Sequence, residues 1–322
     1  MPACQPEPTR PARAQLAALR AAARLTRPPR HRGFGTAVSV LGRRVFPAGT
    51  SCSFSLAGGE LPVELADRYW MRLLLPTWRY EPEVATVLAT ALDGRTVFVD
   101  GGANIGFWSV QALGRVGDGG VIAVEASPRT HARLARTAAA NGGRFAAVHA
   151  ALWDEPGLAL ALDFDPERHG RARVAPAVGA AGTVPTTTVD RLVADHGRPG
   201  ARVVVKLDVE GAEVPALRGA AATLAAGAVV VYEDHGRDRG HAVTRHLLED
   251  QGLAVARWDD DRGGLVPVGD AAELDAVKVH TWKGYNLVAG DLAPVRDLLV
   301  GPRRPPTGPR VGRGPQAGVR ST

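Results

Sequence analysis

A glycine-rich turn between an apolar segment and a helical pattern constrains the fold of this chain most. Residues Thr96–Asp100 are apolar up to their final acid, and Gly101, Gly102 and Gly106 then lead into helix-forming sequence. Glycine tolerates positive φ and lets other atoms approach the backbone closely. The start of the helix offers backbone N–H groups to a ligand. We therefore predict a strand, a tight turn and a helix, with a ligand bound at the turn.

Short apolar segments alternate with helical patterns along the rest of the chain. This alternation favours a mostly parallel sheet covered by helices on both faces, with ligands beyond the carboxyl ends of its strands. Residues 153–185 form a strand-rich insertion that includes Leu158–Phe164. The other predicted strands are Thr36–Leu41, Ser51–Leu56, Val121–Glu125, Ala146–Leu152, Arg202–Leu207, Ala228–Glu233, Leu253–Trp258, Ala276–His280 and Asn286–Ala289, and the clearest helices are Glu64–Leu75, Pro128–Asn141, Val189–His196, Glu213–Leu224 and His241–Gly252.

The residues of the turn indicate which ligand it binds. A nicotinamide dinucleotide site needs G-x-G-x-x-G, whereas this turn has G-x-x-x-G from Gly102 to Gly106. Asp100 is unfavourable beside a pyrophosphate but suits an ammonium group, such as that in the methionine part of S-adenosylmethionine. Glu125 ends the next strand, where a carboxylate accepts hydrogen bonds from both ribose hydroxyls. A tight strand-to-helix turn without a ligand is the alternative interpretation.

Charged side chains also follow two later strands. Asp208, Glu210 and Glu213 come after the apolar strand that ends near Lys206. Such groups are rarely buried without partners. Capping of the next helix explains Glu213 and also accounts for Glu210, so Asp208 is the better functional candidate.

Glu233 and His235 follow the next strand along the chain. A histidine in this position suits a general base, and an incidental loop histidine is the alternative. The aromatic residues before the main domain either line an acceptor site or pack on the sheet; they are Tyr69, Trp70, Trp78 and Tyr80.

The positive charge of the chain lies at its two ends. The formal net charge is +6, but residues 1–33 carry seven Arg and one Glu (+6) and residues 302–322 carry five Arg (+5), which leaves 6 − 6 − 5 = −5 between them. Solvated tails explain such ends, and binding of nucleic acid or an anionic surface is the alternative. Cys4 and Cys52 have no metal-type spacing. No apolar stretch is long enough to span a membrane. The two distant cysteines suit a reducing compartment, and Arg13, Arg20 and Arg24 interrupt any signal-peptide core, so we expect a cytoplasmic protein.

Several segments in this order resemble the FkbM family of S-adenosylmethionine-dependent methyltransferases, over roughly residues 80–290. The combination is specific, above all KLDVEGAE after the glycine turn. The matching segments are Tyr80-Glu81-Pro82, VFVDGGANIG (97–106), VIAVEASP (121–128), AALWD (150–154), VPTTTVDRL (184–192), VVKLDVEGAEVPALRGA (204–220), VVVYEDH (229–235) and YNLVA (285–289).

The resemblance implies the class I methyltransferase fold, an α/β (Rossmann-like) seven-stranded, mostly parallel sheet with helices on both faces. It implies S-adenosylmethionine as cofactor and O-methylation of a natural product, sugar or glycan. Asp100, Gly102, Asn104 and Gly106 would hold the methionine part, and Glu125 the ribose. Glu81, Ala126, Ala151, Leu152 and Asp208 complete the expected cofactor site, while Asp208, Glu210, Glu233 and His235 border the acceptor.

Three residues depart from the family pattern. Gly101 replaces an aliphatic residue, Ala126 a common proline and Arg191 a frequent acid, and none removes a group that the chemistry needs. Because an alcohol is a poor nucleophile until its proton leaves, we expect His235 or Asp208 to act as the base, oriented by Glu210 or Glu233. The spacing of acids along the chain indicates no metal site.

These observations predict four regions: a basic segment 1–33, a substrate-side region 34–80, a methyltransferase domain 81–300 and a basic tail 301–322. Three other functions stay open. They are a nicotinamide-dependent oxidoreductase, a cofactor-binding protein without turnover, and a nucleic-acid methyltransferase that uses the basic ends. We expect the methyl acceptor to be a small molecule or a glycan, and we expect no nucleic-acid partner. We make no prediction of the oligomeric state.

Overall fold

A computed structural model describes residues 50–74, 80–164, 172–176 and 182–301, together with strand β1 (Cys4–Gln5) and the single residues Ala17 and Ala21. The predicted strand Thr36–Leu41, Trp78 and the tail 302–322 lie outside the described residues. Within them, no helix has both the length and the apolar character needed to cross a membrane.

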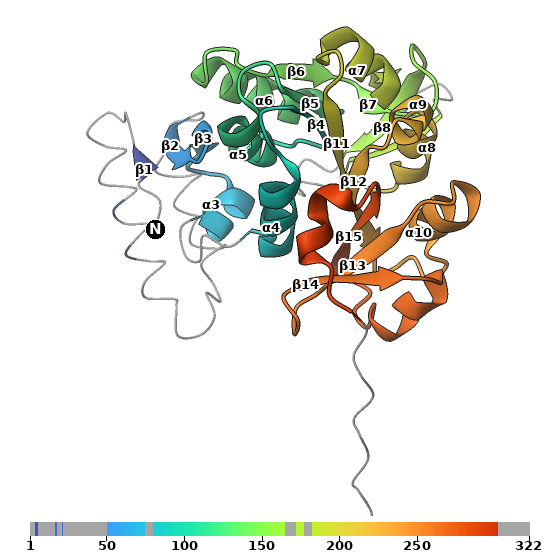
Figure 1. Cartoon of the computed structure of the whole chain (residues 1–322). Coiled ribbons are helices and arrows are strands. Elements are labelled where there is room, and N and C mark those ends of the chain that lie inside the picture. Colours follow the sequence, from blue (N-terminus) through green and yellow to red (C-terminus); the bar gives the residue numbers. More distant parts are fainter. Residues whose placement is uncertain are drawn as a thin grey trace, which may run out of the picture.

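Eight strands form the main sheet, in the order β14-β13-β15-β12-β11-β4-β5-β6 (Figure 1). The strands from β12 to β6 are parallel to one another, and β15 lies antiparallel between β12 and β13. Their bounds are β4 (Thr96–Gly101), β5 (Val121–Glu125), β6 (Ala146–His149), β11 (Arg202–Leu207), β12 (Val229–His235), β13 (Val255–Asp259), β14 (Gly264–Val268) and β15 (Gly284–Gly290).

The predicted mostly parallel α/β sheet is confirmed, with one strand more than expected. β14 pairs antiparallel with the whole length of β13. In the turn that joins them, Gly263 has φ +60° and its N–H donates to the carbonyl of Asp259 over 2.8 Å. Pro267 cannot donate to a sheet hydrogen bond and therefore suits this edge strand.

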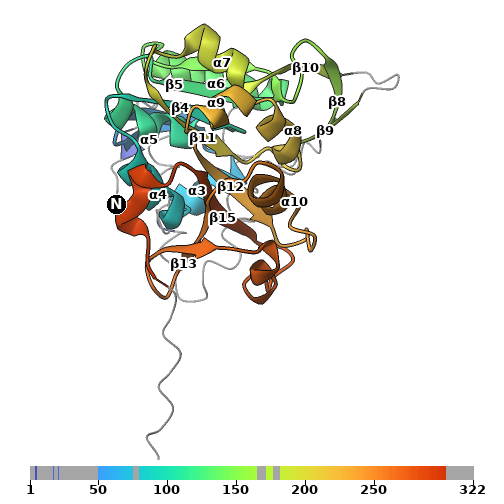
Figure 2. The same cartoon turned by 45° about the vertical axis from the view of Figure 1, so that its right-hand side comes forward.

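Helices cover both faces of the sheet because successive strand residues point to opposite sides. In β4, Phe98 packs in one buried cluster with α4, α5 and α6, while Val97 and Val99 pack in the other with α7, α8, α9 and α10. Figure 2 shows helices around the sheet in a second view. The helices are α4 (Pro82–Ala91), α5 (Phe107–Val116), α6 (Pro128–Ala140), α7 (Val189–His196), α8 (Glu213–Arg218), α9 (Ala221–Ala225) and α10 (Ala242–Arg245), the last followed by a π-helical turn (His246–Asp250).

The segment before the main domain packs directly on it. Strands β2 (Ser51–Leu56) and β3 (Gly59–Glu64) form a hairpin, and helix α3 (Arg68–Leu74) follows. Arg133 of α6 forms ion pairs with Glu64 at 2.7 Å and Asp67 at 3.2 Å. These contacts hold α3 beside the glycine turn.

The predicted strand-rich insertion is a separate small sheet in the order β7-β10-β8-β9. The predicted strand 146–152 divides between the two sheets, with β6 in the main one and β7 in the small one. The bounds in the small sheet are β7 (Ala151–Leu152), β8 (Ala159–Phe164), β9 (Ala172–Pro176) and β10 (Thr183–Thr187).

Two predicted elements differ from the structure near the carboxyl ends of β11 and β12. The helix predicted over 213–224 is interrupted at Gly219, where a side chain would collide with the carbonyl of Trp153. The predicted strand Ala276–His280 is wrong: a 3₁₀ helix (Ala271–Ala276) ends there and the chain turns. Lys278 is fully buried in this turn and bonds to Asp234, so pairing of charges rather than sheet hydrogen bonding organises the segment.

Candidate active site

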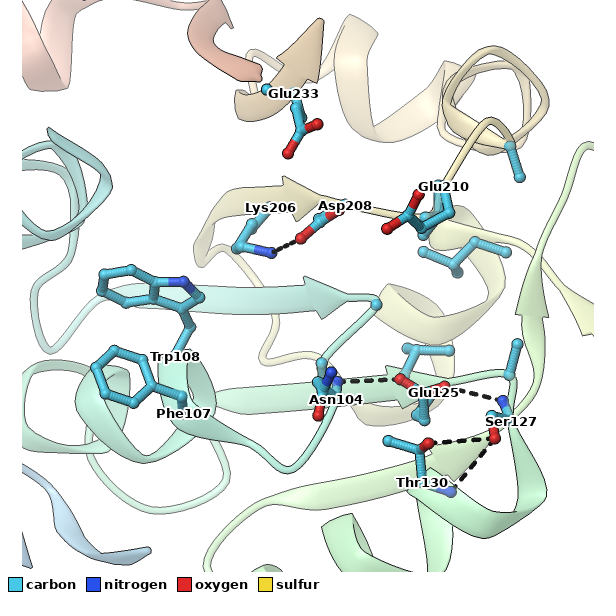
Figure 3. Close-up of a pocket in the computed structure, with 18 of the residues that line it drawn as sticks. Asn104, Phe107, Trp108, Glu125, Ser127, Thr130, Lys206, Asp208, Glu210 and Glu233 are labelled. Carbon is cyan, nitrogen blue, oxygen red and sulfur yellow. Dashed lines mark hydrogen bonds and ion pairs between the residues drawn. The ribbon is translucent and has the colours of Figure 1, made fainter. Parts of the chain in front are cut away.

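A cavity of about 440 Å³ opens at the carboxyl ends of β4, β5, β11 and β12. The strand order reverses between β4 and β11, and ligands bind at such switch points in doubly wound sheets. Figure 3 shows the polar side chains that project into it from these strand ends. Two predicted site residues, Asp100 and Gly106, do not line the cavity. The other predicted site residues line it: Glu81, Gly102, Asn104, Glu125, Ala126, Ala151, Leu152, Asp208, Glu210, Glu233 and His235.

The glycine turn is shaped by its neighbour in the sheet. Gly102 has φ +72°, and a side chain there would collide with the carbonyl oxygen of Asp208. Gly106 has φ +91° and lies against Leu134 of α6. Close packing of protein against protein therefore explains both glycines, in addition to the access to a ligand that the sequence suggested.

Asp100 lies beneath the cavity rather than in its wall. It is fully buried, and its Oδ2 accepts a hydrogen bond of 2.6 Å from the hydroxyl of Ser109. Burial raises the pKa of Asp100, while Lys206 and Ser109 oppose the shift. Asp100 thus acts on the cavity through its charge, and its predicted contact with a ligand stays a prediction.

Glu125 is held by two backbone groups. Its Oε2 accepts from the N–H of Asn104 at 3.0 Å and its Oε1 from the N–H of Ser127 at 2.9 Å (Figure 3). Burial raises the pKa of Glu125 to about 7, and these two hydrogen bonds lower it in part. Since a carboxylate oxygen accepts more than one hydrogen bond, Glu125 keeps acceptor capacity toward the cavity.

Asn104 connects the turn to the N-terminal region. Its φ of 52° is in the left-handed region, and its Oδ1 accepts from the indole N–H of Trp70 at 3.2 Å. Trp70 stacks on Phe107, with ring centroids 5.5 Å apart. Helix α3 therefore fixes the position of Asn104, and through it the geometry around Glu125.

Three carboxylates on separate elements converge at the other end of the cavity. One oxygen from each of Glu81, Asp208 and Glu233 lies within 4.8 Å of the others, close enough to share one positive charge. Lys206, 5% exposed, supplies such a charge, with its Nζ 3.7 Å from Asp208. The spacing of acids along the sequence did not indicate this cluster because the three residues meet only in the fold.

The charges of this cluster depend on one another. Burial raises the pKa of Glu81 to about 7 and that of Glu233 to about 8, with the carboxylate of Asp208 adding to both. Burial by itself lowers the pKa of Lys206, but the carboxylates of Asp208, Asp100, Glu81 and Glu233 outweigh it and raise the value. Lys206 therefore stays charged, and the surrounding acids share its one charge.

Glu81 owes its position to an unusual backbone conformation. It precedes α4 with φ 40°, and its Oε2 accepts from the indole N–H of Trp108 at 3.1 Å. A non-glycine residue in this region is strained and persists when its surroundings hold it. Trp108 stacks on Tyr80, with centroids 5.8 Å apart, so an aromatic wall supports the carboxylate.

His235 lines the cavity at the end of β12, but its ring is oriented by the backbone. Its Nδ1 accepts a hydrogen bond of 3.1 Å from the N–H of Arg237. A neutral ring with Nδ1 as acceptor carries its proton on Nε2. In this tautomer Nε2 of His235 is a hydrogen-bond donor, whereas Glu233 and Asp208 offer carboxylate oxygens as acceptors in the same cavity.

The loop after β11 is organised by Glu213. Its Oε1 accepts from the N–H of Val209 at 3.1 Å and its Oε2 from the N–H of Gly211 at 2.9 Å. Glu213 lies in the first turn of α8, as its sequence position suggested, but its carboxylate holds the preceding loop and makes no cap hydrogen bond to the helix. Glu210 has φ 53° and lines the cavity.

Fold and site together define a doubly wound α/β protein whose cavity lies at the switch point of its sheet. Residues 100–253 match the model described as the Methyltransferase FkbM domain. Residues 100–253 are thus similar to the methyltransferase domain of the FkbM family. A comparison with curated proteins found no match.

Similar solved structures include methyltransferases of several kinds. The methyltransferase FkbM from Methylobacillus flagellatus KT has 13% identity and a TM-score of 0.35, over 80% of this chain and 59% of that one. The precorrin-6y C5,15-methyltransferase from Geobacter metallireducens GS-15 has 16% identity and a TM-score of 0.36, over 64% of this chain and 84% of that one. A SAM dependent methyltransferase from Aquifex aeolicus has 10% identity and a TM-score of 0.35, over 66% of this chain and 90% of that one. At such scores the strand order, rather than the superpositions, defines the fold.

Proposed function

We propose that the protein transfers the methyl group of S-adenosylmethionine to a hydroxyl oxygen of a natural product, sugar or glycan. Glu125 carries this proposal, because it lies at the end of β5, is fixed by Asn104 and Ser127, and faces the cavity. A carboxylate in this position binds the two hydroxyls of a ribose in nucleoside-binding α/β folds. The FkbM match over residues 100–253 supports the reaction class.

The chemistry of the cavity wall fits this cofactor. Beside Glu125 the wall is apolar, with Ala126, Ala151 and Leu152 suited to the face of an adenine ring. Toward Lys206 the wall is acidic, which suits the ammonium and sulfonium charges of the cofactor. A volume of about 440 Å³ also lies within the usual range for such ligands.

When bound, the cofactor supplies an electrophilic methyl group on a positively charged sulfur. The protein aligns the acceptor and excludes water. We assign the base to Glu233, since burial raises its pKa to about 8 and a base works best with a pKa near the operating pH. Asp208 pairs with Lys206, and His235 donates a hydrogen bond to the acceptor.

Calorimetric titration tests the cofactor assignment. We expect S-adenosylmethionine to bind and NAD not to bind, whereas a nicotinamide-dependent oxidoreductase would show the reverse. Incubation with labelled cofactor and a cell extract then identifies the methylated product. Cofactor binding without any labelled product would instead support a binding protein that lacks turnover.

The nucleic-acid alternative has its own test. It predicts salt-dependent RNA or DNA binding that disappears when residues 1–33 and 302–322 are deleted. We expect the deletion to leave cofactor affinity unchanged, because the described residues that line the cavity lie between Tyr69 and Gly284. The cysteine content, two residues in 322, is in keeping with a reducing compartment such as the cytoplasm.

A further inference from the structure

The acidic end of the cavity carries more negative than positive charge. Among the residues described as lining it, Lys206 is the one lysine or arginine. The carboxylates that act on its ammonium group come from four elements: Asp208 after β11, Asp100 in β4, Glu81 before α4 and Glu233 in β12. With all four ionised, the group would carry a net charge of −3, counted as four acids against one lysine.

The fold gives part of this excess charge little access to water, while Glu81, Asp208 and Glu233 are half-buried in the cavity wall. Lys206 and Asp100 are buried, and Glu81 rests against Trp108. Two phenols, Tyr69 and Tyr80, also face the cluster, and burial raises the pKa of each, so both stay neutral. The remaining titratable groups that line this end of the cavity are Glu210 and His235, and Glu83 in the first turn of α4 also raises the pKa of Glu81 through its charge.

We propose that this carboxylate cluster around Lys206 distinguishes S-adenosylmethionine, whose sulfur is positively charged, from its product S-adenosylhomocysteine, whose sulfur is neutral. Binding of the positively charged ligand is coupled to release of a proton from the cluster. The inference rests on the proposed function and concerns the same cavity. Like charges confined together do not all ionise, so the cluster without ligand retains a proton. A ligand that brings a positive charge stabilises the ionised form, and the proton leaves.

The pKa values of the cluster give the direction and the pH range of this coupling. Glu81 titrates at about 7 and Glu233 at about 8. An added positive charge lowers the pKa of both, so protons are released where the pH lies between the bound and the free values. Affinity for a cationic ligand therefore rises as the pH increases toward about 8 and then levels off.

Methyl transfer reverses the coupling. The O–C bond forms while the S–C bond breaks, the electron pair of the S–C bond stays on sulfur, and the hydroxyl proton of the acceptor passes to the Glu233 carboxylate. The sulfur is then neutral and the cluster again holds a proton. The product S-adenosylhomocysteine consequently loses the interaction that distinguished its precursor, which favours its release.

Isothermal titration in phosphate and in Tris tests the proposal, because the two buffers have different ionisation enthalpies and the difference in heat counts the protons released. At about pH 7 we expect S-adenosylmethionine to release more protons than S-adenosylhomocysteine. The ratio of their affinities should rise between about pH 6 and about pH 8, by about tenfold per pH unit for one full proton. Sinefungin, which carries an amine in place of the sulfonium methyl, should behave like S-adenosylmethionine.

Two variants localise the effect. Glu81→Gln should reduce the proton release with S-adenosylmethionine, while Glu155→Gln, an exposed change of the same kind, should not. Equal proton release by both ligands, with an affinity ratio independent of pH, would overturn the inference even if both bind. If neither ligand binds the unaltered protein, the proposed function itself fails. The wild-type comparison decides the matter even where Glu81→Gln does not fold.

Discussion

Glu125 illustrates how far a single side chain depends on backbone groups from other elements. Asn104 belongs to the turn after β4 and Ser127 starts α6, yet both point their N–H groups at one carboxylate. The carboxylate therefore has one orientation before any ligand arrives. Fixing a polar group in advance reduces the entropy lost on binding.

We expect Glu125→Gln to weaken binding of S-adenosylmethionine about tenfold to a hundredfold, because hydrogen bonds to a charged group contribute about 1.5–3 kcal/mol. The amide also offers one acceptor oxygen where the carboxylate has two, so the Asn104 and Ser127 N–H groups cannot both be satisfied. Isothermal titration measures the change. Glu155→Gln is the matched control, and equal losses in the two variants would refute the role of Glu125.

At the scale of elements, the glycine turn and the loop after β11 fit each other. Gly102 at φ +72° passes against the carbonyl of Asp208, and Asp208 in turn donates its N–H to Gly101 over 3.1 Å. Movement of either segment displaces the other. The two strand ends thus behave as one unit.

Gly102→Ala should therefore abolish cofactor binding and lower the melting temperature. It combines positive φ with a steric collision, whereas Gly142 has a similar φ of +68° and open space around it. Gly142→Ala should lose only about 1 kcal/mol of stability, the cost of the backbone conformation. Thermal unfolding with and without cofactor compares them, and similar behaviour of the two variants would contradict the collision.

The turn after the 3₁₀ helix depends on a buried ion pair. Lys278 is fully buried and bonds to Asp234, to the carbonyl of Asp238 at 2.5 Å and to Nδ1 of His241 at 3.0 Å. Asp234 lies between Glu233 and His235 on β12. The pair therefore anchors residues 277–283 over the strand end that carries two site residues.

Lys278→Met should destabilise the fold by about 3–5 kcal/mol, because it leaves Asp234 charged, buried and without its cation. The double variant Lys278→Met with Asp234→Leu should recover much of this loss, since both charges are then gone. Urea unfolding of the four proteins in this cycle gives the coupling energy. Additive losses would show that the two side chains do not act as a pair.

At the scale of the whole molecule, the cavity makes stability depend on pH. Burial holds the pKa of Glu81 and Glu125 at about 7 and that of Glu233 at about 8, above the ordinary value of a glutamate. For an acid with a raised pKa in the folded state, the unfolded chain gives up its proton first as the pH rises. Their contribution to stability is therefore present at low pH and is lost as the pH rises toward about 8.

Glu233→Gln should then stabilise the protein by about 1 kcal/mol at pH 8 relative to the unaltered chain, while methyl transfer is lost. Below about pH 4 the two proteins should be equally stable, because Glu233 is then protonated in both the folded and the unfolded chain. Urea midpoints measured across this range test the dependence. A difference that does not vary with pH would rule out titration of Glu233 as its cause.

Local patterns in the sequence were sufficient for much of the fold. The apolar run before Asp100, the glycines after it and the recurrence of short strands predicted the order of the elements and the position of the cavity. They also placed Glu125 at a strand end. These features follow from side-chain periodicity and backbone preference, which neighbouring residues determine.

Tertiary structure decided which of these residues face one another. Asp100 turns from the cavity toward Ser109, Glu81 meets Asp208 and Glu233 from far along the chain, and Lys206 supplies their shared charge. Burial, pKa and the convergence of charges depend on distances through space, and the sequence records only distances along the chain. The sequence by itself thus determined the ligand-binding framework, while the packing of separate elements decided the charge balance at the proposed site of chemistry.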